Sequence, residues 1–437
     1  MARLALLLLF FVLPATSALS QFDENPPVIG GYVTRAVSLA DFDANGYRVI
    51  INKATMVRIS GTGGKSFITT ATPYFGQGVT IYGSLKEKKH QVIAEDIVFH
   101  PVDQSTLSGI AIVDRVLSPG NPVNGAGRLL VRADGYLILI NAATRTNFQA
   151  PLASTTDVKP NVWIEYHGKM QADGILLADT VLFIENKIAD AEAKLLDKYD
   201  YDPSAVDPNA KQNIAKEIVR GRDPKKIPPF KDAALQARID HIGNSLIPAY
   251  QQKLPESDLT KVVFRFQLID DPTRNDALAL PSGVILIPFQ IVNYLKDDSQ
   301  LATVLADNIA TVLEKQSYRI LPAEHMMTAA NLSSTAVGLL IPGVGLASGI
   351  ATYTRGKYIQ TDLLNQSGRV SLGLLHDAGY DINQAPIAWW LLATSSADKL
   401  PSTPLPHRAA NLYKALGTTW RNYSDDTIST TTTLQTK

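Results

Sequence analysis

The chain is long enough for several domains and carries no net charge. At roughly 150 residues per domain, its 437 residues predict two to three domains. The 41 Lys and Arg residues balance 41 Asp and Glu residues, so no overall field attracts nucleic acid, and no nucleic-acid partner is expected. A composition of 45% hydrophobic and 19% charged residues excludes bulk disorder and a polytopic membrane protein. The absence of cysteine excludes disulfides and thiolate zinc sites, so any metal must be held by His, Asp or Glu.

Residues 1–20 have the pattern of a secretory signal peptide. Arg3 precedes an apolar run over residues 4–13, and Pro14 and a stretch of small residues follow it. The apolar run is shorter than the roughly 18 to 20 residues that a membrane-spanning helix needs, which favours a signal over an anchor. Cleavage is expected before Gln21 or directly after Ala18. The sequence therefore predicts export, to the periplasm or the extracellular space.

Residues 26–186 alternate strand-like runs with Gly, Pro, Asn and Asp, and they contain an internal repeat. Residues 46–55 recur at 135–144, residues 94–99 recur at 178–183, and residues 78–83 match 161–166. The pattern predicts two small β barrels of about five strands each, at 26–118 and 119–186. These units resemble the OB-like modules of exported bacterial proteins, a class that often binds single strands or sugars through aromatic side chains.

The hydrophobic period changes near Asn186. Ile188, Ala191, Leu195 and Leu196 fall on one face of a helix, and Asp-Pro steps and mixed charges follow them. Residues 187–229 are therefore predicted to be a helix and linker, and a second domain is expected at 230–421. The Thr-rich tail, 422–437, is predicted to be disordered.

The second domain carries five phrases in a recognisable order. They are N-D-A-L-A-L-P-S-G-V-I-L-I at 275–287, Q-L-A-T-V-L-A-D-N-I-A-T at 300–311, Q-S-G at 366–368, A-G-Y-D at 378–381 and P-L-P-H-R at 404–408. This order resembles the forty-eighth metallopeptidase family, the zinc endopeptidases of the HtpX and BepA type. The resemblance covers roughly residues 230–416 and implies a zincin-like α+β, mainly helical domain. The predicted fold class is thus multi-domain, with two OB-like barrels followed by this domain.

The residues that hold zinc in the family are replaced here. In the H-E-x-x-H motif two histidines one helical turn apart bind zinc and the glutamate activates a water molecule. The resemblance places these roles at Asp307, Asn308 and Thr311, and the third ligand at Gln366. The family's acidic residue two positions later falls at Gly368. We therefore expect a vestigial site with no catalytic residues, no metal and no cofactor.

Three functions remain open at this point. The sequence favours a non-catalytic protein of the envelope that binds proteins or assists their assembly. An active metalloendopeptidase with a non-standard site, for example one built from Asp307, Glu314 and His325, is the first alternative. A structural module that binds through the β barrels is the second. Glu314 and Lys315 are otherwise interpreted as a solvated helix end.

Two segments are candidates for contact with partners. The family resemblance implies that an extended peptide lies along a sheet edge, here predicted at Gly283, Val284, Ile285, Leu286 and Ile287. Extended or unfolded protein segments are the expected partners, although burial of this strand is the alternative. Residues 335–353 are apolar and uncharged but contain Pro342 and several glycines, which favours a helical hairpin over a spanning helix and permits membrane or partner contact.

Overall fold

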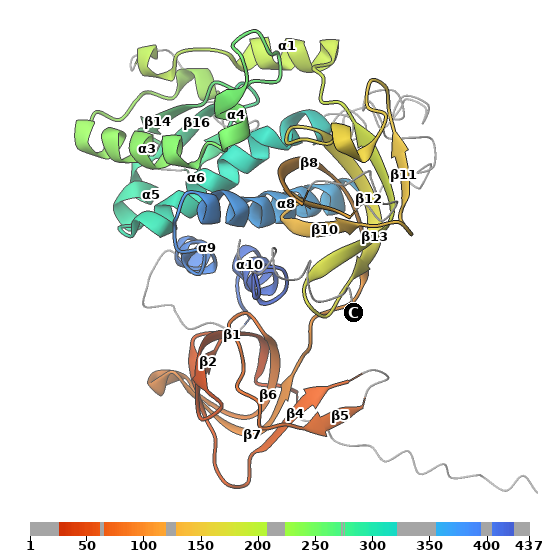
Figure 1. Cartoon of the computed structure of the whole chain (residues 1–437). Helices are drawn as coiled ribbons and strands as arrows, with labels where there is room; N and C mark the ends of the chain where they lie inside the picture. The colour runs from red at the N-terminus through yellow and green to blue at the C-terminus, as the bar shows by residue number, and fades with distance from the viewer. Residues whose placement is uncertain are drawn as a thin grey trace, which may run out of the picture.

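The computed structural model describes residues 26–61, 65–118, 128–207, 223–271, 274, 276–320, 355–394 and 404–423. The chain forms two closed β barrels of five strands followed by a mainly helical region (Figure 1). The predicted signal peptide, the 335–353 segment and residues 424–437 lie outside the described residues. Within the described ranges, no helix combines the length and the hydropathy needed to cross a membrane.

The first barrel is closed by a parallel strand pair. Its closed ring runs β1-β2-β3-β7-β6, and the hairpin β4-β5 continues from β7 as an open extension. Apolar residues alternate inward along these strands and fill the barrel with one core. The strands are β1 (Ile29–Ser38), β2 (Asp41–Ala44), β3 (Tyr47–Ile50), β4 (Met56–Ser60), β5 (Ser66–Ile68), β6 (Gly78–Lys86) and β7 (Gln91–Phe99).

The second barrel repeats this topology, with its ring closed by the parallel pair of β10 and β13. Its first strand, β8, contains residues that the predicted boundary at 118/119 assigns to the first module. Among the described strands, β8 pairs with β9 and β12, and its apolar residues lie in the second barrel's core. The strands are β8 (Thr106–Ser118), β9 (Leu129–Ala133), β10 (Tyr136–Ile140), β11 (Arg145–Phe148), β12 (Trp163–Met170) and β13 (Ile175–Ile184).

Strand pairing follows the internal repeat. The pair Arg48↔Gln91 of the first barrel corresponds to Leu137↔Ile175 of the second, in agreement with the sequence matches 46/135 and 94/178. The repeated Asn-x-x-Thr phrase forms the same turn twice, since Thr55 Oγ1 donates to Ala94 O and Thr144 Oγ1 donates to Ala178 O, both at 2.7 Å.

The predicted match of 78–83 to 161–166 is shifted by two residues. Both β6 and β12 carry a bulge, at Tyr82/Gly83 and at His167/Gly168. Aligning the bulges equates Gly83 with Gly168. The sequence match aligned Gly83 with Tyr166 because the apolar alternation of a strand looks the same after a shift of two residues.

The helical region contains a small sheet of order β14-β16-β15, packed against α3 and α6. The longest described runs of helix, α6 and α8, lie against each other (Figure 1). Asp297 caps α6 by accepting from the Gln300 N–H at 3.0 Å. The elements are α1 (Asp190–Tyr199), α3 (Ala233–Leu246), α4 (Ala249–Lys253), β14 (Arg265–Ile269), β15 (Leu278–Ala279), β16 (Val284–Pro288), α5 (Phe289–Tyr294), α6 (Asp298–Leu313), α8 (Arg355–Asp377), α9 (Gln384–Thr394) and α10 (His407–Gly417).

The predicted sheet edge at Gly283, Val284, Ile285, Leu286 and Ile287 is the middle of the sheet. β16 pairs with β14 on one side and with β15 on the other. Ile285 and Ile287 face the main helical core, whereas Val284 and Leu286 face a second cluster that includes Tyr199 and Tyr201. A continuous apolar run is typical of a strand buried on both faces, which is why the edge assignment was wrong. The edge position next to α6 belongs to β15.

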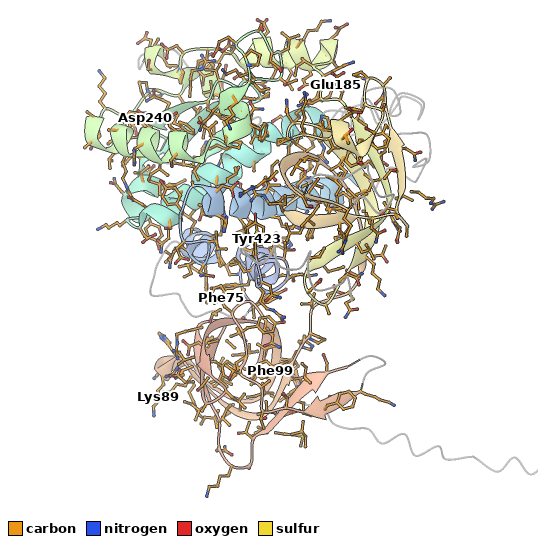
Figure 2. All side chains as sticks on the ribbon, in the orientation of Figure 1. Phe75, Lys89, Phe99, Glu185, Asp240 and Tyr423 are labelled. Carbon is orange, nitrogen blue, oxygen red and sulfur yellow. The ribbon has the colours of Figure 1, made fainter. Side chains whose placement is uncertain are left out.

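Both barrels dock on the helical region through equivalent positions. Tyr32 on β1 stacks on Tyr413 of α10, and Ile112, its counterpart on β8, hydrogen-bonds to Glu314 at the end of α6. The counterparts follow from pairing, since Tyr32 pairs with Gly78 and Ile112 pairs with the equivalent Trp163. Phe75 also packs beneath α10, so the first barrel contributes two aromatic rings to the helical core (Figure 2).

Candidate functional site

The positions that the family resemblance assigns to the zinc site come together between α6 and α8. Asp307, Asn308 and Thr311 lie on α6, and Gln366 and Gly368 lie on α8. A Cβ atom added to Gly368 would stand 3.9 Å from Asp307 Oδ1, so an acidic residue at position 368 would place its carboxylate beside Asp307.

Asp307 is engaged by an arginine. Its side chain is buried, its Oδ2 forms an ion pair with Arg408 of α10, and its Oδ1 accepts from the Ser367 hydroxyl at 3.0 Å. Arg408 also pairs with Asp276, at 2.8 Å, and its guanidinium lies 3.2 Å from the centroid of the Trp389 ring. Burial opposes the charge of Arg408, but the two aspartates outweigh burial and raise its pKa. A cation of the chain itself thus balances the carboxylate at the first ligand position.

Asn308 and Thr311 are satisfied within their own helix. Asn308 Nδ2 donates to Val304 O at 2.8 Å, and Thr311 Oγ1 donates to Asp307 O at 2.9 Å. Polar side chains that bond to the carbonyl one turn earlier are common inside helices and need no ligand. Neither side chain is therefore organised for a metal.

Gln366 connects α8 to the second barrel. Its Nε2 donates to Ile110 O of β8 at 2.9 Å, and its Oε1 accepts from Arg319 Nη1 at 2.7 Å. Both ends of the amide are used, so the third ligand position acts as a joint between the helical region and β8.

Glu314, which the sequence offers either as a ligand of a non-standard site or as part of a solvated helix end, is buried next to this site. It is 1% exposed, and both of its oxygens accept from the Ile112 N–H at 3.2 Å. Burial raises the pKa of Glu314 to about 8, and the nearby Arg319 only partly offsets this effect. The prediction of a solvated helix end is wrong for this residue because β8, 202 residues earlier in the chain, covers it.

These residues do not fit a zinc ion. Zinc needs three or four donors with free lone pairs in tetrahedral geometry. Here the only carboxylate of the set is neutralised by Arg408, the threonine hydroxyl is bonded to its own helix, and the glutamine spans Arg319 and Ile110. Across the described ranges, no group of three His, Asp or Glu side chains is placed to hold a metal, and His325 lies outside those ranges.

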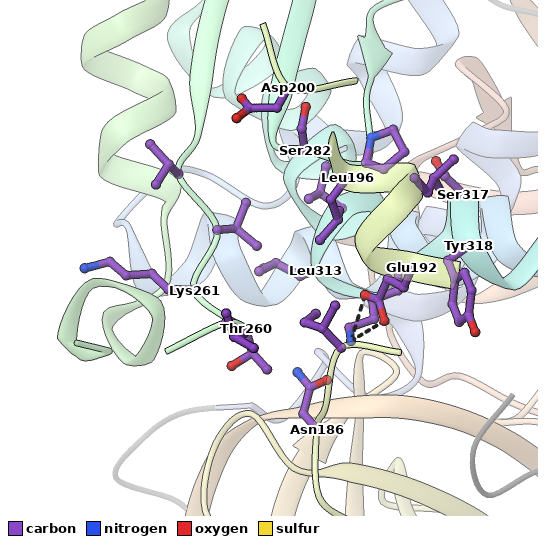
Figure 3. A pocket seen from close by; sticks show the side chains of 18 of the residues that line it. Asn186, Glu192, Leu196, Asp200, Thr260, Lys261, Ser282, Leu313, Ser317 and Tyr318 are labelled. Atoms are coloured by element: carbon purple, nitrogen blue, oxygen red, sulfur yellow. Dashed lines mark hydrogen bonds and ion pairs between the residues drawn. The ribbon is translucent and has the colours of Figure 1, made fainter. Parts of the chain in front are cut away.

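Three cavities surround the site. One, of about 240 Å³, lies between α1, the end of α6 and the segment before β14, and Thr311 is on its wall (Figure 3). A second, of about 310 Å³, lies between the second barrel, α1 and the end of α6. The buried pair of Glu192 and Lys315, 2.8 Å apart, lines both of them. A third, of about 370 Å³, lies between β8 and α8 and includes Gln366 on its wall.

The fold and site define a protein of two barrels and a helical region, in which an ion pair occupies the expected first ligand position and hydrogen-bonded neutral side chains occupy the others. Sequence comparison points in the same direction. The chain is 26% identical over 196 residues to a protein of Vibrio cholerae named beta-barrel assembly-enhancing protease. The match covers 41% of this chain and 38% of that protein, so the chain spans about two fifths of its relative's length. No family model matches the chain. The similarity supports a distant relationship to metallopeptidases of this type.

Proposed function

We propose that this is an exported, non-catalytic relative of the zinc metalloendopeptidases that acts in the bacterial envelope by binding extended protein segments. The observation that carries the proposal is the ion pair of Asp307 with Arg408, which places a fixed positive charge beside the first ligand position. A zinc ion at this position would be repelled by the positive charge of Arg408. The relative's name, which refers to β-barrel assembly, supports a role among envelope proteins.

The binding edge that we propose is β15. Within the part of the chain that the structure describes, β15 pairs only with β16 and is next to α6. Leu280 N donates to Val284 O, and N–H groups alternate in direction along a strand. The N–H of Ala279 therefore points away from the sheet. An extended segment can add to such an edge by backbone hydrogen bonding without any metal.

Peptide titration with a proline variant tests this edge. Ala279→Pro removes the outward N–H but keeps the pairs with β16, whereas Ala279→Val keeps that N–H and serves as the matched control. We expect the wild type and Ala279→Val to bind C-terminally amidated extended peptides with dissociation constants of micromolar order, roughly 8 kcal/mol. Ala279→Pro should bind at least about tenfold more weakly. Equal binding by all three proteins, or by none, would exclude β15 as the peptide-binding edge.

One observation favours binding through the first barrel instead. β5 is an edge strand of the described residues, and its Phe67 and Ile68 are 58% and 82% exposed. Exposed apolar edge strands are uncommon in monomeric proteins and frequently pair with other chains. The double variant Phe67→Ser/Ile68→Ser separates the two surfaces, because it should leave peptide binding at β15 unchanged and abolish binding if the barrel is the working surface.

A further inference from the structure

The cavity of about 310 Å³ beside the second barrel is lined by apolar side chains and by several charged ones. Its size falls at the lower end of the roughly 300–1,000 Å³ typical of small-molecule sites. Trp163 lies on the wall with its Nε1 bonded to Asn186, so its ring, not its N–H, is available to a ligand. The apolar part of the wall comprises Ile110, Ala150, Trp163, Ile184, Ile188 and Ala189.

Two of the three cations on this wall are already paired with carboxylates. Lys315 pairs with Glu192 at 2.8 Å, and Lys187 pairs with Glu185 at 2.7 Å. The third cation, Arg319, contacts the amide oxygen of Gln366 at 2.7 Å and the backbone oxygen of Glu314 at 3.3 Å. Its nearest carboxylate, that of Glu314, is 3.8 Å away.

Two nitrogen atoms of the Arg319 guanidinium are available to a ligand. A guanidinium carries five N–H groups, and both hydrogen bonds of Arg319 use Nη1. Among the described residues, Nε and Nη2 therefore have no acceptor. The side chain is 17% exposed and also lines the neighbouring cavity of about 370 Å³. The Trp163 ring lies 5.8 Å from its guanidinium, so the charge and the apolar wall meet at one point.

Burial weakens Glu314 as a partner for Arg319, because it raises the pKa of that carboxyl. With its pKa at about 8, Glu314 is mainly protonated at pH 7. The other groups that face Glu314 are Asp134 and Asp114 of the second barrel and Tyr250 of α4. Asp134 pairs directly with Arg369 and acts on Arg319 only through its charge, and Asp114 pairs with Arg132.

We propose that this cavity binds a monocarboxylate with an apolar body, whose carboxylate pairs with Nε and Nη2 of Arg319 and whose apolar part lies against Trp163. A fatty acid anion and the C-terminal residue of a protein chain share this chemistry. The two proposed sites are tested separately. The amidated peptides used to test β15 have no terminal carboxylate, so their binding does not report on this cavity.

Calorimetric titration of the full chain with three probes tests the proposal. N-acetylphenylalanine represents a chain end, its amide is the uncharged control, and decanoate represents a fatty acid. We expect at least one acid to bind, the amide to bind at least about tenfold more weakly than its acid, and Arg319→Gln to lose the difference. Lys187→Gln, which removes a wall cation that is already paired, should bind like the wild type. The acid that binds more tightly identifies the source of the ligand.

The pH dependence tests the same site without removing Arg319. As Glu314 ionises above pH 8 it should compete for Arg319, so the affinity for the acid should fall about tenfold between pH 7 and 9. Glu314→Gln should abolish this fall. Equal binding of acid and amide, no binding of either acid, or an affinity that Glu314→Gln leaves equally pH-dependent would overturn the proposal.

Discussion

Replacing Arg408 by methionine should destabilise the helical region far more than a typical surface change. The substitution keeps much of the apolar stem but leaves the Asp307 carboxylate, which is 3% exposed, without its cation. Removing one partner of a buried ion pair costs about 3–5 kcal/mol, and the lost stacking on Trp389 adds ~0.5–1 kcal/mol. Asp276 contributes little because its side chain is 49% exposed.

A double-mutant cycle isolates the pair. In Asp307→Asn/Arg408→Met no carboxylate is left unpaired at position 307, so the double variant should be more stable than Arg408→Met by about 2–3 kcal/mol. Urea unfolding followed by tryptophan fluorescence suits this test, since three of the four tryptophans, Trp389, Trp390 and Trp420, belong to the helical region. Additive effects of the two substitutions, or a loss below about 1 kcal/mol for Arg408→Met, would show that the ion pair does not stabilise the helical region.

Three further predictions concern the contacts of the barrels, two of them with the helices and one within the second barrel. The folded-state pKa of Glu314, about 8, exceeds the ordinary 4.5, so the free energy of unfolding should fall as pH rises through this window. The slope should reach ~1.4 kcal/mol per pH unit relative to Glu314→Gln, as measured by urea unfolding across pH. Gly76→Ala should undock the first barrel, seen as a larger radius of gyration in X-ray scattering, because φ at Gly76 is +78° and its Cβ would meet Tyr413 O at 2.3 Å. Gly30→Ala is the control, since no atom lies within 4 Å of the added Cβ. Thr144→Val should destabilise the second barrel by about 1–3 kcal/mol in thermal unfolding, because it leaves the Ala178 carbonyl without its donor.

The sequence could predict the features that depend on local pattern. The internal repeat predicted two small barrels of about five strands each, and the phrase at 300–311 predicted that Asp307, Asn308 and Thr311 share a helix, which is α6. β16 was wrongly placed at an edge because a short apolar run does not reveal how many strands flank it. Its composition nevertheless favoured burial on both faces.

The contacts that convert the site into a joint could not be predicted in this way. Gln366 meets Ile110 across 256 residues of sequence, and Glu314 meets Ile112 across 202. Their partners are backbone groups, which leave no trace in residue type. Arg408 belonged to a matched phrase, but only the packing of α10 shows that it pairs with Asp307.

The zinc content of the purified chain shows whether the site between α6 and α8 has lost its metal. The full chain, expressed in zinc-supplemented medium, would be analysed for metal beside Asp307→Ala and assayed for cleavage of casein. We expect fewer than ~0.1 tightly held zinc ions per chain in both proteins and no cleavage by either, because the ligand set lacks the free donors of a structural or catalytic site. About one zinc per wild-type chain that is lost in Asp307→Ala, together with casein cleavage, would contradict this expectation.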